Sequence, residues 1–191
     1  MKYDLSKPIT HSAERTLAAF SGALFQLLAE KAFEEISAGE ICLEAQFPRS
    51  TFYNYFDDKY DLLNYCWITL TKEIGLGEYR HTQENEMLYI YFDRIYDFTQ
   101  AHLDVIDAIL SHNSEVGYMF SSFHSFLNRE MRTIFKDCPE ASRMDIPNEL
   151  LADHYSNTLF LVWEWATRES RGFSKEKAHS YLKLLLSFEH A

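Results

Sequence analysis

Apolar residues recur at helical spacing along most of this 191-residue chain. Leu17, Phe20, Leu24, Leu27 and Leu28 follow the i, i+3, i+4 pattern that places one apolar stripe on the side of a helix facing a core. The chain has only 6 Gly and 4 Pro, which is too few for the many turns of an all-β fold. The pattern therefore predicts an all-α protein, and a hydrophobic content of 47% allows a substantial core.

A helix start is predicted at residues 37–40, Ser-Ala-Gly-Glu, which match a capping box. In this motif the Ser and Glu side chains each bind the backbone amide of the other residue. Ile36 and Ile41 flank the box as a hydrophobic staple. A short helix should start here and run to about Gln46, because Pro48 disfavours helical geometry at the residue before it.

The next stretch, residues 49–56, predicts a helix of about two turns. On a helical wheel Phe52 and Phe56 share one face, and Ser50 and Asn54 lie opposite. Two short helices joined by a tight turn, the second anchored by aromatics and polar on its outer side, are typical of a helix-turn-helix DNA reader. Geometry alone leaves a second interpretation open, a small helical cap whose outer residues are merely solvated.

Beyond residue 58 large apolar and aromatic residues become more frequent. Their spacing predicts helices near 58–75, 84–101, 103–111, 115–136, 147–171 and 174–188. We therefore expect two domains, residues 1–57 with the helix-turn-helix and residues 58–191 as a larger helical domain.

The stretch from Leu17 to Leu63 resembles the N-terminal domain of TetR-type transcriptional regulators, most clearly in EISAGEICLEAQFPRSTFYNYFDDKYDLL, residues 35–63. The matching positions, in order, are Ile36, Ile41, Thr51, Phe52, Tyr53, Phe56, Lys59, Leu62 and Leu63. The resemblance implies a DNA-binding domain followed by a helical domain that binds a small-molecule effector and forms a homodimer.

DNA contacts are implied by the same resemblance, which assigns phosphate binding to Tyr53 and Lys59. The full set of expected DNA-binding residues is Arg49, Ser50, Thr51, Tyr53, Asn54, Tyr55 and Lys59. Tyr55 lies about 60° from Phe52 on the helical wheel, so half burial in the core is an equal alternative for it.

Two positions depart from the usual pattern of the family. Gln46 stands where Gly is more frequent, and a non-glycine residue at a left-handed turn position carries strain. Pro48 stands where Ser or Thr is more frequent, and it supplies no side-chain oxygen to the amides of the following helix.

The charge of the chain argues against nonspecific nucleic-acid binding, which depends on cation density. The formal net charge is −11, and residues 1–60 contain nine acidic against six basic side chains. Specific binding stays possible if basic side chains face the DNA and a dimer doubles the contacts. The alternative is a helical small-molecule- or partner-binding protein with a degenerate helix-turn-helix.

Large side chains on the middle helices predict a ligand pocket, with ordinary core packing as the alternative for each of them. The candidates are Trp67, Tyr89, Phe92, Tyr96, Phe120, Phe123, His124 and Trp163. An aromatic lining suits an apolar or planar molecule, and the sequence does not fix its identity.

The last two predicted helices are apolar on more than one side, which indicates a further partner. The candidate dimer residues are Leu159, Trp163, Tyr181, Leu182, Leu185 and Phe188. A two-fold dimer would present two recognition helices to a palindromic operator with half-sites roughly 34–36 Å apart, and a buried monomer core is the alternative. We expect a repressor that releases its operator when the effector binds, with activation as the alternative, because the outcome depends on where the operator lies relative to a promoter.

Other function classes lack support in the sequence. The chain has no HExxH, GxSxG, GxGxxG or GxxxxGK[ST] motif, so we expect no enzyme, no metal and no cofactor. Cys42, Cys66 and Cys138 show no CxxC spacing, which favours reduced packing thiols. No leader pattern or apolar run of 18 residues occurs, so we expect a cytoplasmic protein that does not bind membranes.

Overall fold

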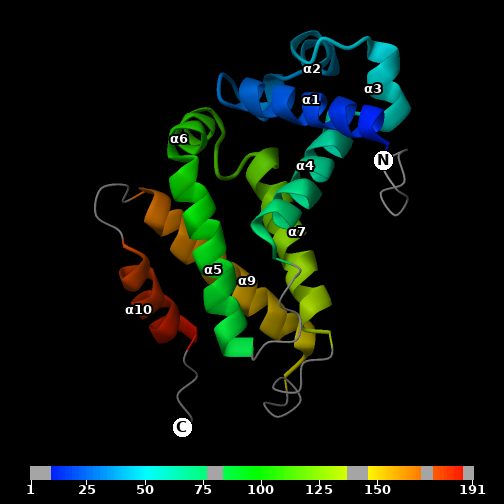
Figure 1. Cartoon of the computed structure of the whole chain (residues 1–191). Coiled ribbons are helices and arrows are strands. Elements are labelled where there is room, and N and C mark those ends of the chain that lie inside the picture. The colour runs from blue at the N-terminus through cyan, green and yellow to red at the C-terminus, as the bar shows by residue number, and fades with distance from the viewer. Residues whose placement is uncertain (1–9, 77–83, 137–145, 169–173, 187–191) are drawn as a thin grey trace. The chain divides into compact units, whose positions relative to one another are not determined.

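The computed structural model describes residues 10–76, 84–136, 146–168 and 174–186. Every regular element within these ranges is a helix (Figure 1), which confirms the all-α prediction. The elements are α1 (His11–Leu28), the 3-10 helix η1 (Phe33–Glu35), α2 (Ala38–Glu44), α3 (Arg49–Tyr55), α4 (Lys59–Ile74), α5 (Glu84–Ala101), α6 (Leu103–His112), α7 (Tyr118–Ile134), α9 (Asn148–Arg168) and α10 (Lys175–Leu186).

The chain forms two compact units, and each is assembled from two separate stretches. Among the described residues, unit 1 takes those up to Leu70 together with His102–Phe123, and unit 2 takes Thr71–Ala101 together with those from His124 onward. Unit 1 therefore contains the first three α-helices, most of α4, all of α6 and the start of α7. The functional division at residue 57 stays a prediction, because compactness does not report function.

Side-chain caps fix the starts of the first two α-helices. Thr10 Oγ1 accepts a hydrogen bond from the amide of Ala13 at 3.3 Å before α1. Before α2, Ser37 Oγ accepts from the amide of Glu40 at 3.3 Å, and the Ser37 amide donates to Glu40 Oε2 at 2.9 Å. The predicted capping box is thus confirmed, and a cap of this kind contributes about 1 kcal/mol.

Phe20 on α1 is the centre of the aromatic core of unit 1. Its ring makes edge-to-face contacts with Phe52 at 5.3 Å and with Phe56 at 6.2 Å, measured between ring centroids. All three side chains are fully buried, as the helical wheel predicted for the two residues of the recognition stretch. Such pairs add about 0.5–1.5 kcal/mol beyond area burial, so they hold α3 firmly on α1.

The turn between α2 and α3 has a left-handed residue at Gln46, with φ of 55°. The Phe47 amide donates to Cys42 O at 3.0 Å and the Gln46 amide donates to Leu43 O at 3.1 Å, the two bonds of a Schellman motif. The predicted left-handed turn is therefore present. It ends α2 at Glu44, two residues earlier than the sequence pattern indicated.

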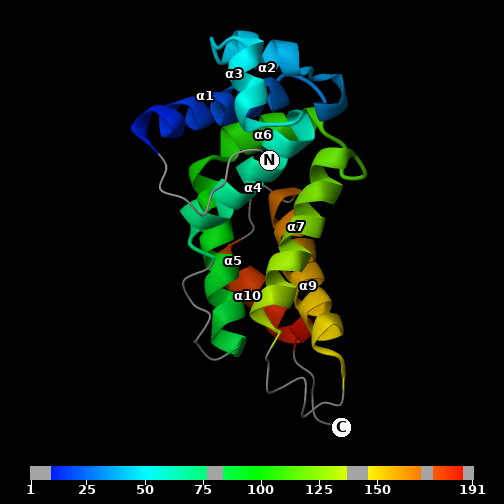
Figure 2. The ribbon, with the colours of Figure 1, turned by 90° about the vertical axis from the view of Figure 1, so that its right-hand side faces the viewer.

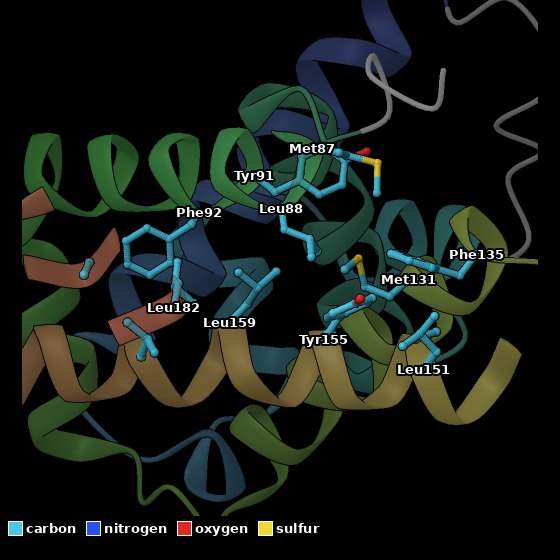
Figure 3. Packing of buried hydrophobic residues seen from close by; sticks show 13 residues of the cluster. Met87, Leu88, Tyr91, Phe92, Met131, Phe135, Leu151, Tyr155, Leu159 and Leu182 are labelled. Atoms are coloured by element: carbon cyan, nitrogen blue, oxygen red, sulfur yellow. The ribbon is translucent and has the colours of Figure 1, made fainter. Parts of the chain in front are cut away.

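Unit 2 has a core shared by four helices (Figure 3). The main buried contributors are Met87, Leu88, Tyr91 and Phe92 of α5, Met131 of α7, Leu151, Tyr155 and Leu159 of α9, and Leu182 of α10. Figure 2 shows α7 beside α9, where Arg132 Nε donates to Asp153 Oδ1 at 2.7 Å. The bulky residues of this cluster thus serve packing.

The thiols of Cys42 and Cys66 are free and buried, as predicted. Burial raises the pKa of Cys66 to about 12, so this thiol stays protonated and unreactive. Cys138 lies outside the described residues.

Candidate DNA-binding surface

Helix α3 has a buried side and an exposed side. Its exposed residues are Arg49, Ser50, Tyr53 and Asn54, and Thr51 and Tyr55 are half-buried. The Tyr53 side chain is 45% exposed, whereas Phe52 is fully buried beneath it with the two rings 5.4 Å apart. Six of the seven predicted DNA contacts therefore lie on one short helix whose polar side is accessible.

Pro48 occupies the N-cap position of α3, with φ of −62° and ψ of 150°. Its carbonyl oxygen accepts from the amides of Thr51 at 3.0 Å and Phe52 at 3.3 Å. No side chain caps the helix, as the sequence indicated. The first turn of α3 is thus positioned by the fixed φ of proline and by aromatic packing.

Arg49, the first residue of α3, lies across Gly39 in the first turn of α2. A Cβ atom built on Gly39 would overlap the guanidinium, with Arg49 Cζ 3.1 Å away. The absence of a side chain at Gly39 therefore makes room for the arginine at the junction of the two helices.

Lys59 begins α4 and turns its ammonium toward η1. Lys59 Nζ donates to the carbonyl oxygens of Phe33 at 2.8 Å, Glu34 at 3.0 Å and Ile36 at 2.7 Å. The same nitrogen lies 4.6 Å from the centre of the Phe33 ring. Partial burial lowers the pKa of Lys59. All three ammonium protons are engaged inside the protein, and phosphate binding by Lys59 stays a prediction.

The predicted pocket residues divide between the two units. Trp67, Phe120 and Phe123 belong to unit 1, where the first two are buried. Trp67 Nε1 donates to Ser122 Oγ at 3.1 Å, and its ring lies 4.9 Å from that of Phe123. These contacts link α4 to the start of α7.

The other pocket candidates, Tyr89, Phe92, Tyr96, His124 and Trp163, belong to unit 2. Phe92 is fully buried in the core. His124 Nε2 lies 2.6 Å from Asn157 Oδ1, and Trp163 Nε1 donates to Thr99 Oγ1 at 2.9 Å. Burial raises the pKa of the Tyr89 hydroxyl. Each of these side chains has a structural contact, and ligand binding by them stays a prediction.

The candidate dimer residues occupy different environments within unit 2. Leu159 and Leu182 are buried in its core, at 6% and 0% exposure. Trp163 and Tyr181 are half-buried, and Leu185 is 47% exposed. Phe188 lies outside the described residues.

Four exposed apolar residues on the same two helices were not among the predicted dimer contacts, and one of them, Leu150, lies at the start of α9. Leu161 and Trp165 on α9 are 52% and 44% exposed, and Leu184 on α10 is 75% exposed. Leu161 and Trp165 are four residues apart and so share a helix face. That spacing was visible in the sequence, but the direction of the face was not.

Within its described part, the chain has neither a candidate metal-binding cluster nor a helix suited to spanning a membrane. No three His, Cys, Asp or Glu side chains gather there in a way that could hold a metal ion. None of the described helices combines the length and apolar character needed to cross a membrane.

Solved structures with a similar fold are regulators of transcription and metabolism. The fatty acid degradation regulator FadR from Bacillus halodurans is 17% identical, with 97% of this chain and 100% of that chain covered and a TM-score of 0.63. The dihydroxyacetone kinase operon activator DhaS is 18% identical, with 90% and 94% covered and a TM-score of 0.53. A protein from Syntrophomonas wolfei str. Goettingen, described as a TetR-family transcriptional regulator, is 15% identical, with 92% and 97% covered and a TM-score of 0.59.

Sequence comparison adds to this likeness of fold. No curated protein matches the sequence. Residues 22–66 match the family of bacterial regulatory proteins named after tetR, over the same stretch that contains α2, α3 and the start of α4. Residues 22–66 therefore form a helix-turn-helix DNA-binding domain of the tetR family, and the all-helical fold of the chain is similar to that of solved transcriptional regulators.

Proposed function

We propose that this protein is a TetR-type, ligand-responsive repressor that binds a palindromic DNA operator as a homodimer in the cytoplasm and catalyses no reaction. The observation that carries the proposal is the two-sided character of α3, with Phe52 and Phe56 fully buried and a polar row exposed. A short helix anchored in this way can enter a major groove without losing its own packing.

The exposed row offers two kinds of DNA contact. The hydroxyl of Tyr53 suits a phosphate oxygen, and the Asn54 amide has the donor and acceptor needed to bind adenine in two places. Arg49 adds a cation at the start of the same helix. Phosphate contacts set affinity for any sequence, while the amide provides a preference for particular bases.

A second copy of the chain is the proposed partner of the exposed apolar face on α9 and α10. This face comprises Leu161, Trp165, Leu184 and Leu185. Trp165 and Tyr181 make an edge-to-face contact at 5.8 Å, which joins the two helices beneath it. Contiguous apolar surface on a protein marks an interaction site, and a two-fold pair matches it to itself. Leu159 and Leu182 remain in the core behind the face.

The proposed effector is a small apolar or planar molecule, because the middle helices are rich in aromatic side chains. FadR is a regulator of fatty acid degradation and DhaS is an activator of a dihydroxyacetone kinase operon, so similar folds occur in regulators of different processes. We propose repression because a dimer covering a palindrome excludes other proteins from that DNA. The effector releases the operator if it binds more tightly to a dimer whose recognition helices no longer match the half-sites.

The test is selection of bound duplexes from a random library by the purified full chain. We expect a palindrome with half-sites about one DNA turn apart. Tyr53→Phe keeps the ring on Phe52 and should weaken binding to all sequences roughly 2- to 10-fold, as expected for one hydrogen bond. Asn54→Ala should relax the preference at one position of each half-site. Absence of any enriched sequence at low salt would reject the proposal.

One other function has specific support, a small-molecule- or partner-binding protein with a degenerate helix-turn-helix. The lack of a side-chain cap at Pro48 and the net charge of −11 favour it. Salt titration separates the two functions. A DNA reader loses affinity steeply as salt rises, because phosphate contacts release counterions, whereas a degenerate motif shows no binding to lose.

A further inference from the structure

The segment Phe33–Ile36, here called the η1 strap, is tied to the helix that follows the recognition helix. Lys59 at the start of α4 donates to the carbonyl oxygens of Phe33, Glu34 and Ile36, each within 3.0 Å. Three charge-assisted hydrogen bonds from one ammonium are stronger than neutral bonds of the same number. The start of α4 is therefore tied to the strap at three points.

The connection from α4 back to α3 is short and closed by hydrogen bonds. The Asp61 amide donates to Asp58 Oδ1 at 2.9 Å, and Asp61 Oδ2 accepts from the Asp57 amide at 3.1 Å. Phe56, the C-cap of α3, is fully buried just before these residues. A displacement of Lys59 would therefore move the C-terminal end of α3 with it.

On its other side the strap is bound by the end of α6. Asn113, 4% exposed, accepts from the Phe33 amide through Oδ1 at 2.9 Å. Its Nδ2 donates to Leu28 O at 3.0 Å and to Ile109 O at 2.9 Å. One buried amide thus joins the end of α1, the strap and α6, and both of its polar atoms are satisfied.

The first residue of α7 provides a third attachment. The Tyr118 amide donates to Glu34 Oε1 at 2.9 Å, and this bond is the main reason that the pKa of Glu34 lies below its ordinary value. The Tyr118 ring stacks on Phe33 at 5.6 Å and meets Tyr60 edge-on at 4.7 Å. The α6–α7 junction therefore contacts the strap through backbone amides, the Glu34 carboxylate and stacked rings.

We propose that the η1 strap positions the recognition helix, held by Lys59 on one side and by Asn113 on the other, so that the α6–α7 junction sets the orientation of α3. This inference rests on the proposed function, because it assumes that α3 reads DNA. Lys59 is then a positioning residue whose effect on DNA binding passes through the strap. A phosphate contact of Lys59, which the family resemblance implies, is the competing role, and the experiments below distinguish the two.

Hydrogen exchange of the protein without DNA tests whether Lys59 and Asn113 stabilise α3 through the strap. Lys59→Met keeps the apolar stem and removes the ammonium, and Asn113→Leu removes the buried amide at similar size. Both variants should speed exchange of the Ile36 amide and of the α3 amides, although residue 113 lies on a different element. Amides of α9 serve as the control for global opening. Unchanged exchange in α3 in both variants would overturn the proposal.

Binding to the selected operator across salt concentrations tests the DNA part. Removing a phosphate contact should reduce the slope of log affinity against log salt by about 0.9, and Arg49→Met is the reference for that behaviour. Lys59→Met and Asn113→Leu should instead lose about fivefold or more in affinity at every salt concentration with the wild-type slope. The fold loss in affinity of the double variant should be smaller than the product of the fold losses of the two single variants, because both act through one strap.

Two results separate this proposal from the proposed function. A reduced salt slope for Lys59→Met, together with wild-type affinity for Asn113→Leu, would show that Lys59 contacts phosphate and would overturn the positioning role. No DNA binding by the wild type would reject the proposed function, and exchange would still decide whether the strap controls α3. Glu34→Ala, at an exposed side chain, is the milder variant if Asn113→Leu does not fold.

Discussion

Trp163 donates its indole N–H to the hydroxyl oxygen of Thr99 at 2.9 Å, which joins α9 to α5 inside unit 2. Thr99 is 3% exposed, and its own hydroxyl donates to Ile95 O at 2.7 Å. Thr99→Val keeps the shape but leaves the indole without this acceptor, so the free energy of unfolding should fall by about 1–3 kcal/mol. Urea titration measures it. Thr99→Ser, which keeps the hydroxyl, should lose less, and a Val variant as stable as the wild type would contradict the expectation.

Gln46 should be a site where glycine stabilises the protein. Its φ of 55° is left-handed, which costs a non-glycine residue about 1–2 kcal/mol. Glycine removes that strain but gains freedom in the unfolded chain, worth about 0.4–1 kcal/mol. Gln46→Gly should therefore raise the unfolding free energy by up to about 1.5 kcal/mol, whereas Gln46→Ala should not. Destabilisation by glycine, measured by the same titration, would show that the Gln46 side chain outweighs the backbone strain.

Stability should depend on pH through Glu40. Hydrogen bonds from Lys31 and then from Ser37 lower the pKa of Glu40 from 4.5 to about 2. A carboxyl with a lower pKa in the folded state stabilises the fold above its unfolded pKa, and this contribution is lost as pH falls from 4.5 toward 2. The wild type should therefore lose more stability than Glu40→Gln when urea midpoints are compared at about pH 5 and about pH 3. Parallel losses in the two proteins would contradict this.

Charge placed on the face of α9 and α10 should separate the proposed dimer. Trp165→Asp and Leu185→Asp each bury a carboxylate in an apolar interface, so both should sediment as monomers at concentrations where the wild type is a dimer. Leu43→Asp is the matched control, because Leu43 is 80% exposed on α2 in unit 1. A monomeric wild type, or variants that remain dimeric, would refute the proposal that this face is the dimer interface.

Local features of unit 1 could be predicted because their signals lie within a few residues. The capping box at Ser37 and Glu40 depends on residues three apart, and the inward direction of Phe52 and Phe56 depends on helical period alone. The left-handed turn at Gln46 followed from the position of the motif. Each of these was decided by backbone geometry over one or two turns.

Long-range roles could not be predicted in the same way. Asn113 binds Phe33, 80 residues earlier, and Leu28, 85 residues earlier, and nothing around Asn113 in the sequence points to either. The contacts of the Lys59 ammonium likewise depend on where the carbonyl oxygens of Phe33, Glu34 and Ile36 lie. On α9, helical period identified Leu159 and Leu161 as belonging to different faces, but only packing shows which of them is buried.

Because unit 1 is built from two stretches of the chain, its N-terminal helices depend on residues far along the sequence. Residues 102–123 return to the unit that contains the helix-turn-helix, and Asn113 within them completes the hydrogen bonding of Leu28 and Phe33. Recombination that joined residues 1–57 to an unrelated C-terminal half would remove these partners and leave buried backbone groups unsatisfied. The α6–α7 junction should therefore be inherited together with the helices of residues 1–57, because exchanging it alone would unmake the interior of unit 1.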